Sequence, residues 1–146
     1  MLAAPRSHFA ARIAGINLIN GTLEGDGVLR TAAGTRWYGV ITADSGLQQG
    51  QRAVAVFTPA AVAVYRDWPH GSPRNTVAVT VAEIDARGAA IRVRADEQAD
   101  GAPGLAADIT AGAAAELRLA AGERVYFSVK TQEVTLYPGL RTAIQR

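Results

Sequence analysis

Apolar and polar residues alternate over much of this 146-residue chain, and a period of two is typical of half-buried β-strands. In the clearest run, residues 76–84, valine occupies positions 77, 79 and 81 and so lies on one face. Residues 124–130 alternate in the same way, which turns their apolar side chains inward and presents Ser128 and Lys130 on the other face. Further strands are predicted at residues 15–23, 28–31, 35–41, 52–57, 62–65, 89–94, 105–109 and 134–137.

Glycine-containing turns separate these runs. Residues 24–27 and 33–34 are examples, and they recur at the short spacing expected of β-barrels. One segment, the alanine-rich stretch at residues 111–119, is predicted to be helical. The pattern therefore predicts an all-β protein with one short helix.

The chain also contains an internal repeat. Residues 47–52, LQQGQR, match residues 119–124, LAAGER, at an offset of 72, and the same register pairs Tyr65 with Tyr137. Because both turn and strand positions match in one register, we expect two copies of a small β-unit. The predicted architecture is a pair of tandem five-stranded barrels of the oligonucleotide/oligosaccharide-binding (OB) type.

The repeat also suggests where the units begin and end. Residues 67–74 are polar and contain two prolines and a glycine, which is typical of a linker. The first unit is therefore predicted at residues 8–66 and the second at residues 75–140. The start of the chain lacks the apolar stretch of a signal peptide, and no window approaches 18 uninterrupted apolar residues. We expect a soluble, cytoplasmic piece of a longer protein.

Composition argues against several classes of chemistry. The chain has no cysteine and only two histidines, which removes disulfides and cysteine nucleophiles and leaves few candidates for a zinc centre or a general base. A phosphate-binding GxxxxGK[ST] loop needs a lysine after a glycine, whereas the single lysine, Lys130, follows Val129. The motifs GxSxG, HExxH and GxGxxG do not occur. The chain is therefore predicted not to be an enzyme.

Hydroxyl, amide and cationic side chains at strand ends suit a small oxyanion instead. A tetrahedral dianion is bound by many neutral N–H and O–H donors together with one or two cations. The candidate anion-binding residues are Ser72, Arg74, Asn75, Thr110, Ser128, Lys130 and Thr131. Taken singly, Thr110 is as well suited to capping the following helical turn, and Asn75 to fixing a turn. Only their joint occurrence favours a site.

Two of these groups carry a family resemblance. Residues 108–134 resemble the molbindin, or Mop, pattern ITxxAxxELxLxxGxxVxxxxKxxxV, and Ser72-Pro73-Arg74-Asn75 resembles the SxRN that opens a Mop unit. Residues 9–21 are similar to the junction between the nucleotide-binding domain and the C-terminal TOBE region of importer ATPases. The chain thus resembles the C-terminal TOBE/Mop regulatory region of a molybdate ABC importer's ATP-binding subunit.

This resemblance implies a cytoplasmic domain that forms a homodimer and binds molybdate or tungstate between its units, with no cofactor, so that intracellular oxyanion modulates transport. It implies an attached ATPase domain, which would make the parent subunit an ABC transporter ATPase, and membrane subunits that hold it at the inner face of the plasma membrane. Some positions depart from the pattern. Pro73 replaces the small residue that usually follows the serine of SxRN. In the first unit, Thr58 occupies the position equivalent to Lys130, and residues 11–12 only faintly echo SxRN.

Two other functions remain open at this stage. A ligand-free structural TOBE domain would serve dimerisation or bind a regulatory protein, and Lys130 would then be a solvated strand-end charge. A nucleic-acid-binding barrel needs exposed aromatics for base stacking and a basic track for phosphates. Because the aromatic residues of this chain are scattered and its formal net charge is only +2, we expect no nucleic-acid partner.

Overall fold

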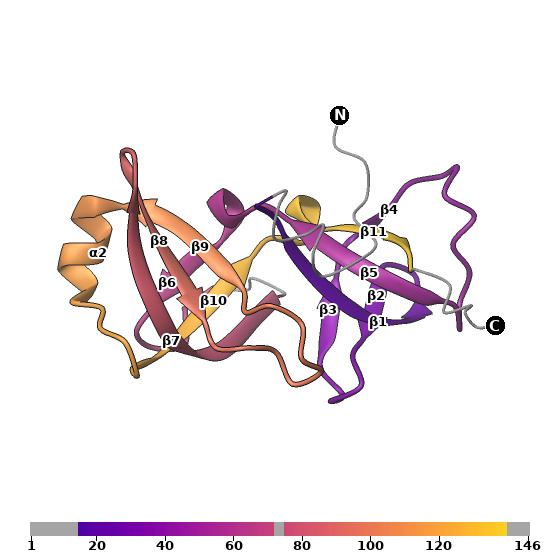
Figure 1. Cartoon of the computed structure of the whole chain (residues 1–146). Coiled ribbons are helices and arrows are strands. Elements are labelled where there is room, and N and C mark those ends of the chain that lie inside the picture. The colour runs from indigo at the N-terminus through magenta and orange to yellow at the C-terminus, as the bar shows by residue number, and fades with distance from the viewer. Residues whose placement is uncertain (1–14, 72–74, 140–146) are drawn as a thin grey trace.

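The computed structural model describes residues 15–71 and 75–139, which form two β-units side by side (Figure 1). The first sheet has the spatial order β3 (Arg36–Tyr38), β2 (Val28–Arg30), β1 (Asn17–Gly25), β5 (Arg52–Phe57), β11 (Thr135–Pro138) and β4 (Val40–Ile41). The second has the order β6 (Ala63–Tyr65), β10 (Arg124–Val129), β7 (Asn75–Arg87), β8 (Ala90–Ala95) and β9 (Ala106–Thr110). All pairings are antiparallel except that of β11 with β4.

The predicted all-β class is confirmed, and each predicted strand is present. The run predicted at residues 35–41 divides into β3 and β4 at Gly39, where a Cβ atom would lie 2.9 Å from the Val134 carbonyl oxygen. The one α-helix, α2 (Ala111–Leu117), ends two residues earlier than predicted because Arg118 adopts a left-handed conformation with φ of 52°. Short 3₁₀ turns, η1 (Pro59–Ala61) and η2 (Thr131–Glu133), follow β5 and β10.

The two units exchange their last strands. β6 follows β5 in the chain but pairs with β10 of the second sheet, where Val64 lies opposite Phe127. β11 follows β10 but pairs with β5 of the first sheet, where Leu136 lies opposite Ala55. Both pairs obey the sequence offset of 72, so the exchange is reciprocal. The predicted linker at residues 67–74 lies between the two sequence repeats. The first sheet nevertheless contains β11 from the second repeat, and the second sheet contains β6 from the first.

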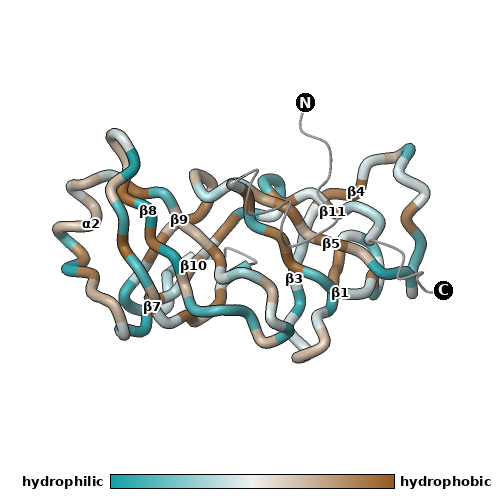
Figure 2. Tube along the Cα trace, in the orientation of Figure 1, coloured by the Kyte–Doolittle hydropathy of each residue, from teal (hydrophilic) through white to brown (hydrophobic). Residues whose placement is uncertain are grey.

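One large hydrophobic cluster joins the two sheets, and a smaller one contains Leu18 and Val54. The fully buried side chains of the large cluster include Ile19 and Leu29 from the first half of the chain and Val93, Val125 and Leu136 from the second. Figure 2 shows hydrophobic and hydrophilic positions alternating along the strands, as the period of two requires. The inward placement predicted for the apolar residues of β10 is confirmed, since all three are at most 3% exposed. Burial of one shared core ties the stability of each unit to the other.

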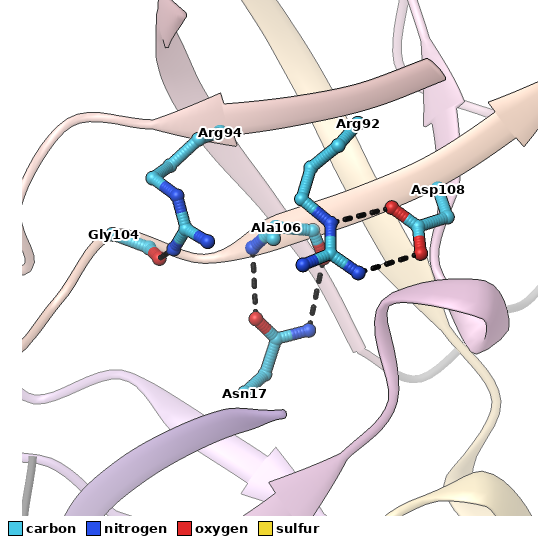
Figure 3. A network of polar contacts seen from close by, with 6 residues as sticks. All are labelled: Asn17, Arg92, Arg94, Gly104, Ala106 and Asp108. Atoms are coloured by element: carbon cyan, nitrogen blue, oxygen red, sulfur yellow. Dashed lines mark hydrogen bonds and ion pairs between the residues drawn. The ribbon is translucent and has the colours of Figure 1, made fainter. Parts of the chain in front are cut away.

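Two buried asparagines close the units against each other. The Asn17 Oδ1 accepts from the Ala106 N–H at 2.8 Å, and its Nδ2 donates to the Ala106 carbonyl at 2.9 Å (Figure 3). The Asn75 Oδ1 accepts from the Tyr38 N–H at 2.7 Å, and its Nδ2 donates to the Tyr38 carbonyl at 2.8 Å. Each amide side chain thus satisfies both backbone groups of one residue on the edge strand of the other unit.

These two clamps are equivalent in the repeat. Asn17 lies opposite Phe57 in the β1–β5 ladder, and Asn75 lies opposite Val129 in the β7–β10 ladder, again at the offset of 72 between Phe57 and Val129. The first-unit counterpart of Asn75 is therefore Asn17. Residues 11–12, which only faintly echo SxRN, lie outside the described residues.

We predict that Asn75→Ala lowers the free energy of unfolding by roughly 2–4 kcal/mol, because it removes both hydrogen bonds that the buried amide makes with the Tyr38 backbone. Asn75→Asp keeps the acceptor and loses the donor, so its loss of unfolding free energy should lie between zero and that of Asn75→Ala. Urea denaturation followed by circular dichroism measures both. Gln132→Ala, at an exposed position, is the control, and an Asn75→Ala loss as small as that of this control would contradict the clamp.

Candidate functional site

A cleft of about 400 Å³ opens where the exchanged strands leave their own units. Its walls come from the β5–η1–β6 segment of the first unit and from the end of β10 and η2 of the second. The lining residues are Thr58, Ala60, Ala61, Ala63, Tyr65, Ser128, Val129, Lys130 and Glu133. Thr58 and Lys130 are equivalent in the repeat and yet line the same cleft. The cleft is therefore lined by equivalent positions from both repeats.

Lys130 supplies the positive charge among the residues that line this cleft. It is exposed at the start of η2, and its ammonium makes no hydrogen bond or ion pair with residues 15–71 or 75–139. Glu133, three residues later, lines the same cleft and offsets part of that charge. A ligand with negative charge in this cleft would thus meet both an ammonium and a carboxylate.

Hydroxyl groups flank Lys130 in the chain. Ser128 lies on the same face of β10 as Lys130 but is only 4% exposed, because its Oγ contacts the Thr76 Oγ1 of β7 at 2.9 Å. Two hydroxyls that share one hydrogen bond retain one O–H hydrogen, which remains available to a further acceptor. The Thr131 Oγ1 is buried and has no hydrogen-bond partner among the described residues. Such a group requires an explanation, since buried hydroxyls are normally satisfied.

Two other predicted residues have structural partners. Thr110 caps α2, where its Oγ1 accepts from the Ala113 N–H at 3.0 Å, so the capping alternative describes its contact in this structure. Asn75 uses its amide in the clamp to Tyr38. Neither residue lines the cleft. Ser72 and Arg74 lie outside the described residues.

The structure therefore brings together Ser128 and Lys130, with Thr131 next in the chain, and adds residues that the sequence analysis left out of the site. Thr58, Thr76 and Glu133 are these additions. The repeat offset of 72 was the signal that could have placed Thr58 beside Lys130. No comparable signal existed for Thr76, because its contact with Ser128 depends on the register between β7 and β10.

Several arginines are engaged elsewhere. The guanidinium of Arg92 donates to both carboxylate oxygens of Asp108, at 2.7 and 2.8 Å, and Arg94 donates to the Gly104 carbonyl at 3.0 Å (Figure 3). The hydrogen bond from Arg92, reinforced by its charge, holds the pKa of Asp108 below its ordinary value. Arg66 donates to the Leu117 carbonyl at 2.7 Å and forms an ion pair with Glu123, which follows α2 in the chain. These guanidiniums stabilise the fold.

The Arg92–Asp108 pair predicts a pH dependence of stability. A carboxyl whose pKa is depressed on folding contributes stability above its unfolded pKa, and this contribution is lost as the pH falls through the folded pKa. We expect Asp108→Asn to be less stable than the natural chain near pH 7 and the difference to shrink as the pH falls below about 4. Urea denaturation at several pH values measures this. For the exposed control Asp44→Asn we expect a difference of less than about 0.5 kcal/mol throughout. A difference for Asp108→Asn that does not change with pH would contradict the assignment.

Two other kinds of site can be described briefly. Among residues 15–71 and 75–139, no group of three or more His, Asp or Glu side chains is placed to hold a metal ion. Within the same residues, no helix has the length and apolar character needed to cross a membrane.

The chain is similar to known proteins in both sequence and fold. Residues 71–136 match the TOBE domain family. The chain is 60% identical over 138 residues to the molybdenum import ATP-binding protein ModC from two strains of Mycobacterium tuberculosis, a match that covers 94% of this chain but 37% of ModC. It thus spans little more than a third of the length of these relatives. A crystal structure of the cytoplasmic molybdate-binding protein ModG with molybdate bound superposes with a TM-score of 0.71 and 25% identity, over 84% of this chain and 95% of ModG.

Proposed function

We propose that this chain, which carries a TOBE domain at residues 71–136, is the molybdate- or tungstate-binding regulatory part of an importer's ATP-binding subunit. The observation that carries the proposal is the cleft at Lys130, in a chain that is 60% identical over 94% of its length to a molybdenum import ATP-binding protein. The likeness to ModG, crystallised with molybdate bound, supports the same ligand class.

The donors of the cleft suit a tetrahedral dianion. Lys130 provides one cation, and Ser128, which also lines the cleft, shares one hydrogen bond with Thr76 and leaves one O–H hydrogen between the two hydroxyls. Thr131 does not line the cleft but follows Lys130 in the chain, and its buried hydroxyl has no partner among the described residues. Charge-assisted hydrogen bonds to oxyanions are stronger than neutral ones, so the ammonium would contribute most of the affinity. Asn75 lies opposite Val129, the neighbour of Lys130, and the SxRN resemblance assigns Ser72 and Arg74 to the same site. Thr110 belongs to the proposed set because it matches the threonine in the ITxxA segment of the Mop pattern.

Regulation would follow from where the cleft lies. An anion held between β5–η1–β6 and β10–η2 contacts both units at once, so it stabilises the arrangement in which both walls reach it. A ligand shifts an equilibrium only as far as its affinity differs between the two states. In the full-length protein, which we propose to be a homodimer at the inner face of the membrane, that difference would be passed to the attached ATPase domains and the transporter's membrane subunits.

The ligand-free structural TOBE domain is the second candidate, and one observation favours it. Glu133 lines the same cleft as Lys130, and the equivalent of Lys130 in the first unit is the uncharged Thr58. In that case the chain would serve dimerisation or bind a regulatory protein without an anion. A direct binding measurement separates the two candidates.

We predict that the purified chain binds molybdate saturably in isothermal titration calorimetry and that Lys130→Met weakens binding about tenfold or more, because one charge-assisted contact is worth about 1.5–3 kcal/mol. Methionine keeps an unbranched apolar stem without the charge. Arg52→Met, which removes an exposed cation outside the cleft, should leave the affinity unchanged. Sulfate is the competitor control. Absence of heat and of any shift in melting temperature at millimolar molybdate would favour the ligand-free domain.

The repeat suggests a gain-of-affinity variant. Thr58→Lys places a second ammonium at the position equivalent to Lys130 in the same cleft, so we expect molybdate to bind about threefold to fivefold more tightly at low salt. The gain should fade at high ionic strength. Thr58→Gln, which adds length without charge, is the matched control. Equal affinities for the Lys and Gln variants would show that the Thr58 position does not face the anion.

A further inference from the structure

A second cleft, of about 640 Å³, lies between the two units and shares no residue with the cleft at Lys130. It is bounded by β1, β7, the turn between β2 and β3, and the loop that joins β8 to β9. Its apolar lining residues include Ile19, Trp37, Val77, Val79 and Leu105. A cleft of this size with an apolar floor is typical of a binding site.

The cleft also exposes an open strand edge. Residues 75–80 of β7 pair with β10 on one side, but β8 pairs with β7 only from Val81 onward. The Thr80 carbonyl accepts from the Asp96 N–H at 2.9 Å and so points away from β10. Because the direction of backbone groups alternates along a strand, the Ala78 N–H and carbonyl point to the same open side. Ala78 lines the cleft and has no partner there among the described residues.

Carboxylates surround this edge. Asp96, Glu97 and Asp100 line the cleft, and Arg124 is the one cationic side chain among its lining residues. The formal net charge of the whole chain is +2, so the acidic character is local to this cleft. Charge complementarity therefore favours a basic occupant over an acidic one.

The loop that carries these carboxylates is held in place without a ligand. The Gln98 side-chain amide donates to the Leu18 carbonyl of β1 at 2.9 Å and to the Pro103 carbonyl at 3.0 Å. The Asp100 carboxylate accepts from the Ala102 N–H at 3.0 Å. These contacts fix both walls of the cleft, which lowers the ordering cost of binding.

We propose that this cleft binds an extended segment of a partner protein that carries basic residues between apolar ones. The segment adds a strand to the open edge of β7 at Ala78, places apolar side chains on the floor at Trp37 and Val79, and directs its basic side chains to Asp96 and Glu97. Backbone pairing provides affinity and the alternate side chains provide specificity, as in other cases of strand addition. The assignment uses no residue of the proposed anion site.

The test uses Trp37 as its reporter. Trp68→Phe leaves Trp37 as the single tryptophan, and phenylalanine preserves the aromatic contact of position 68 with Tyr126. The probe is the capped peptide acetyl-Val-Arg-Val-Arg-amide. We expect a saturable change in Trp37 fluorescence and at least tenfold slower hydrogen exchange of the Ala78 amide when the peptide is bound.

Matched variants separate strand addition from other binding. Asp96→Asn with Glu97→Gln should weaken peptide binding at least tenfold, whereas Asp44→Asn with Glu116→Gln, which removes two exposed carboxylates elsewhere, should not. The peptide N-methylated at its central valine should also bind at least tenfold more weakly, because it cannot complete the backbone pairing.

Five outcomes would overturn the proposal. They are an unchanged Trp37 signal at millimolar peptide, equal binding of the N-methylated peptide, and equal binding of acetyl-Val-Glu-Val-Glu-amide. The fourth is an equal response to arginine amide alone, which would make the occupant a small cation. A Trp37 signal that changes with protein concentration in the absence of peptide would place a second copy of the chain in the cleft and would also overturn it.

Discussion

The reciprocal exchange of β6 and β11 is the constraint on which the rest of the molecule depends. Each sheet obtains one strand from the other unit, so neither half of the chain can complete its own sheet or bury its own core. The asparagine clamps flank the same strands, because Asn17 and Asn75 begin β1 and β7, which pair with β5 and β10, the strands that receive β11 and β6. A two-unit protein of this kind unfolds as one body rather than as two domains joined by a linker.

The same exchange explains why the repeat has diverged in some places and not in others. Buried positions in and just before the exchanged strands are apolar in both copies, as Val62 and Val134 or Val64 and Leu136 are. Positions that line the cleft differ in charge, since Thr58 is replaced by Lys130 and Ala61 by Glu133. Fold stability constrains the first set through the shared core. The cleft-lining positions do not have to stay apolar for the fold to be stable. Substitutions there can therefore change the ligand preference.

Much of the fold could be predicted from the sequence, because alternation and turns are local signals. The strand exchange could not, since Val62 and Val64 are equally able to pack on either sheet and the pattern does not name the partner. The site was predictable only in part for the same reason. Lys130 follows from its place at a strand end, whereas the Ser128–Thr76 contact depends on register and the Asn75 clamp on a residue of the other unit. The contact of Thr110 with the Ala113 N–H, in contrast, follows from a local capping rule and could be predicted from the sequence.

Strand β7 lines the second cleft and pairs with β10, whose end lines the first. Thr76 contacts Ser128 at the edge of the cleft that holds Lys130, and Ala78, two residues further along, presents its backbone to the second cleft. Both residues belong to the continuous ladder that pairs β7 with β10, so a displacement of one along that ladder displaces the other. Ligands at the two clefts could influence each other only through a difference in affinity between positions of this strand, and the influence would be equal in both directions. Because the two clefts share no lining residue, one anion and one basic segment could occupy them together without competing.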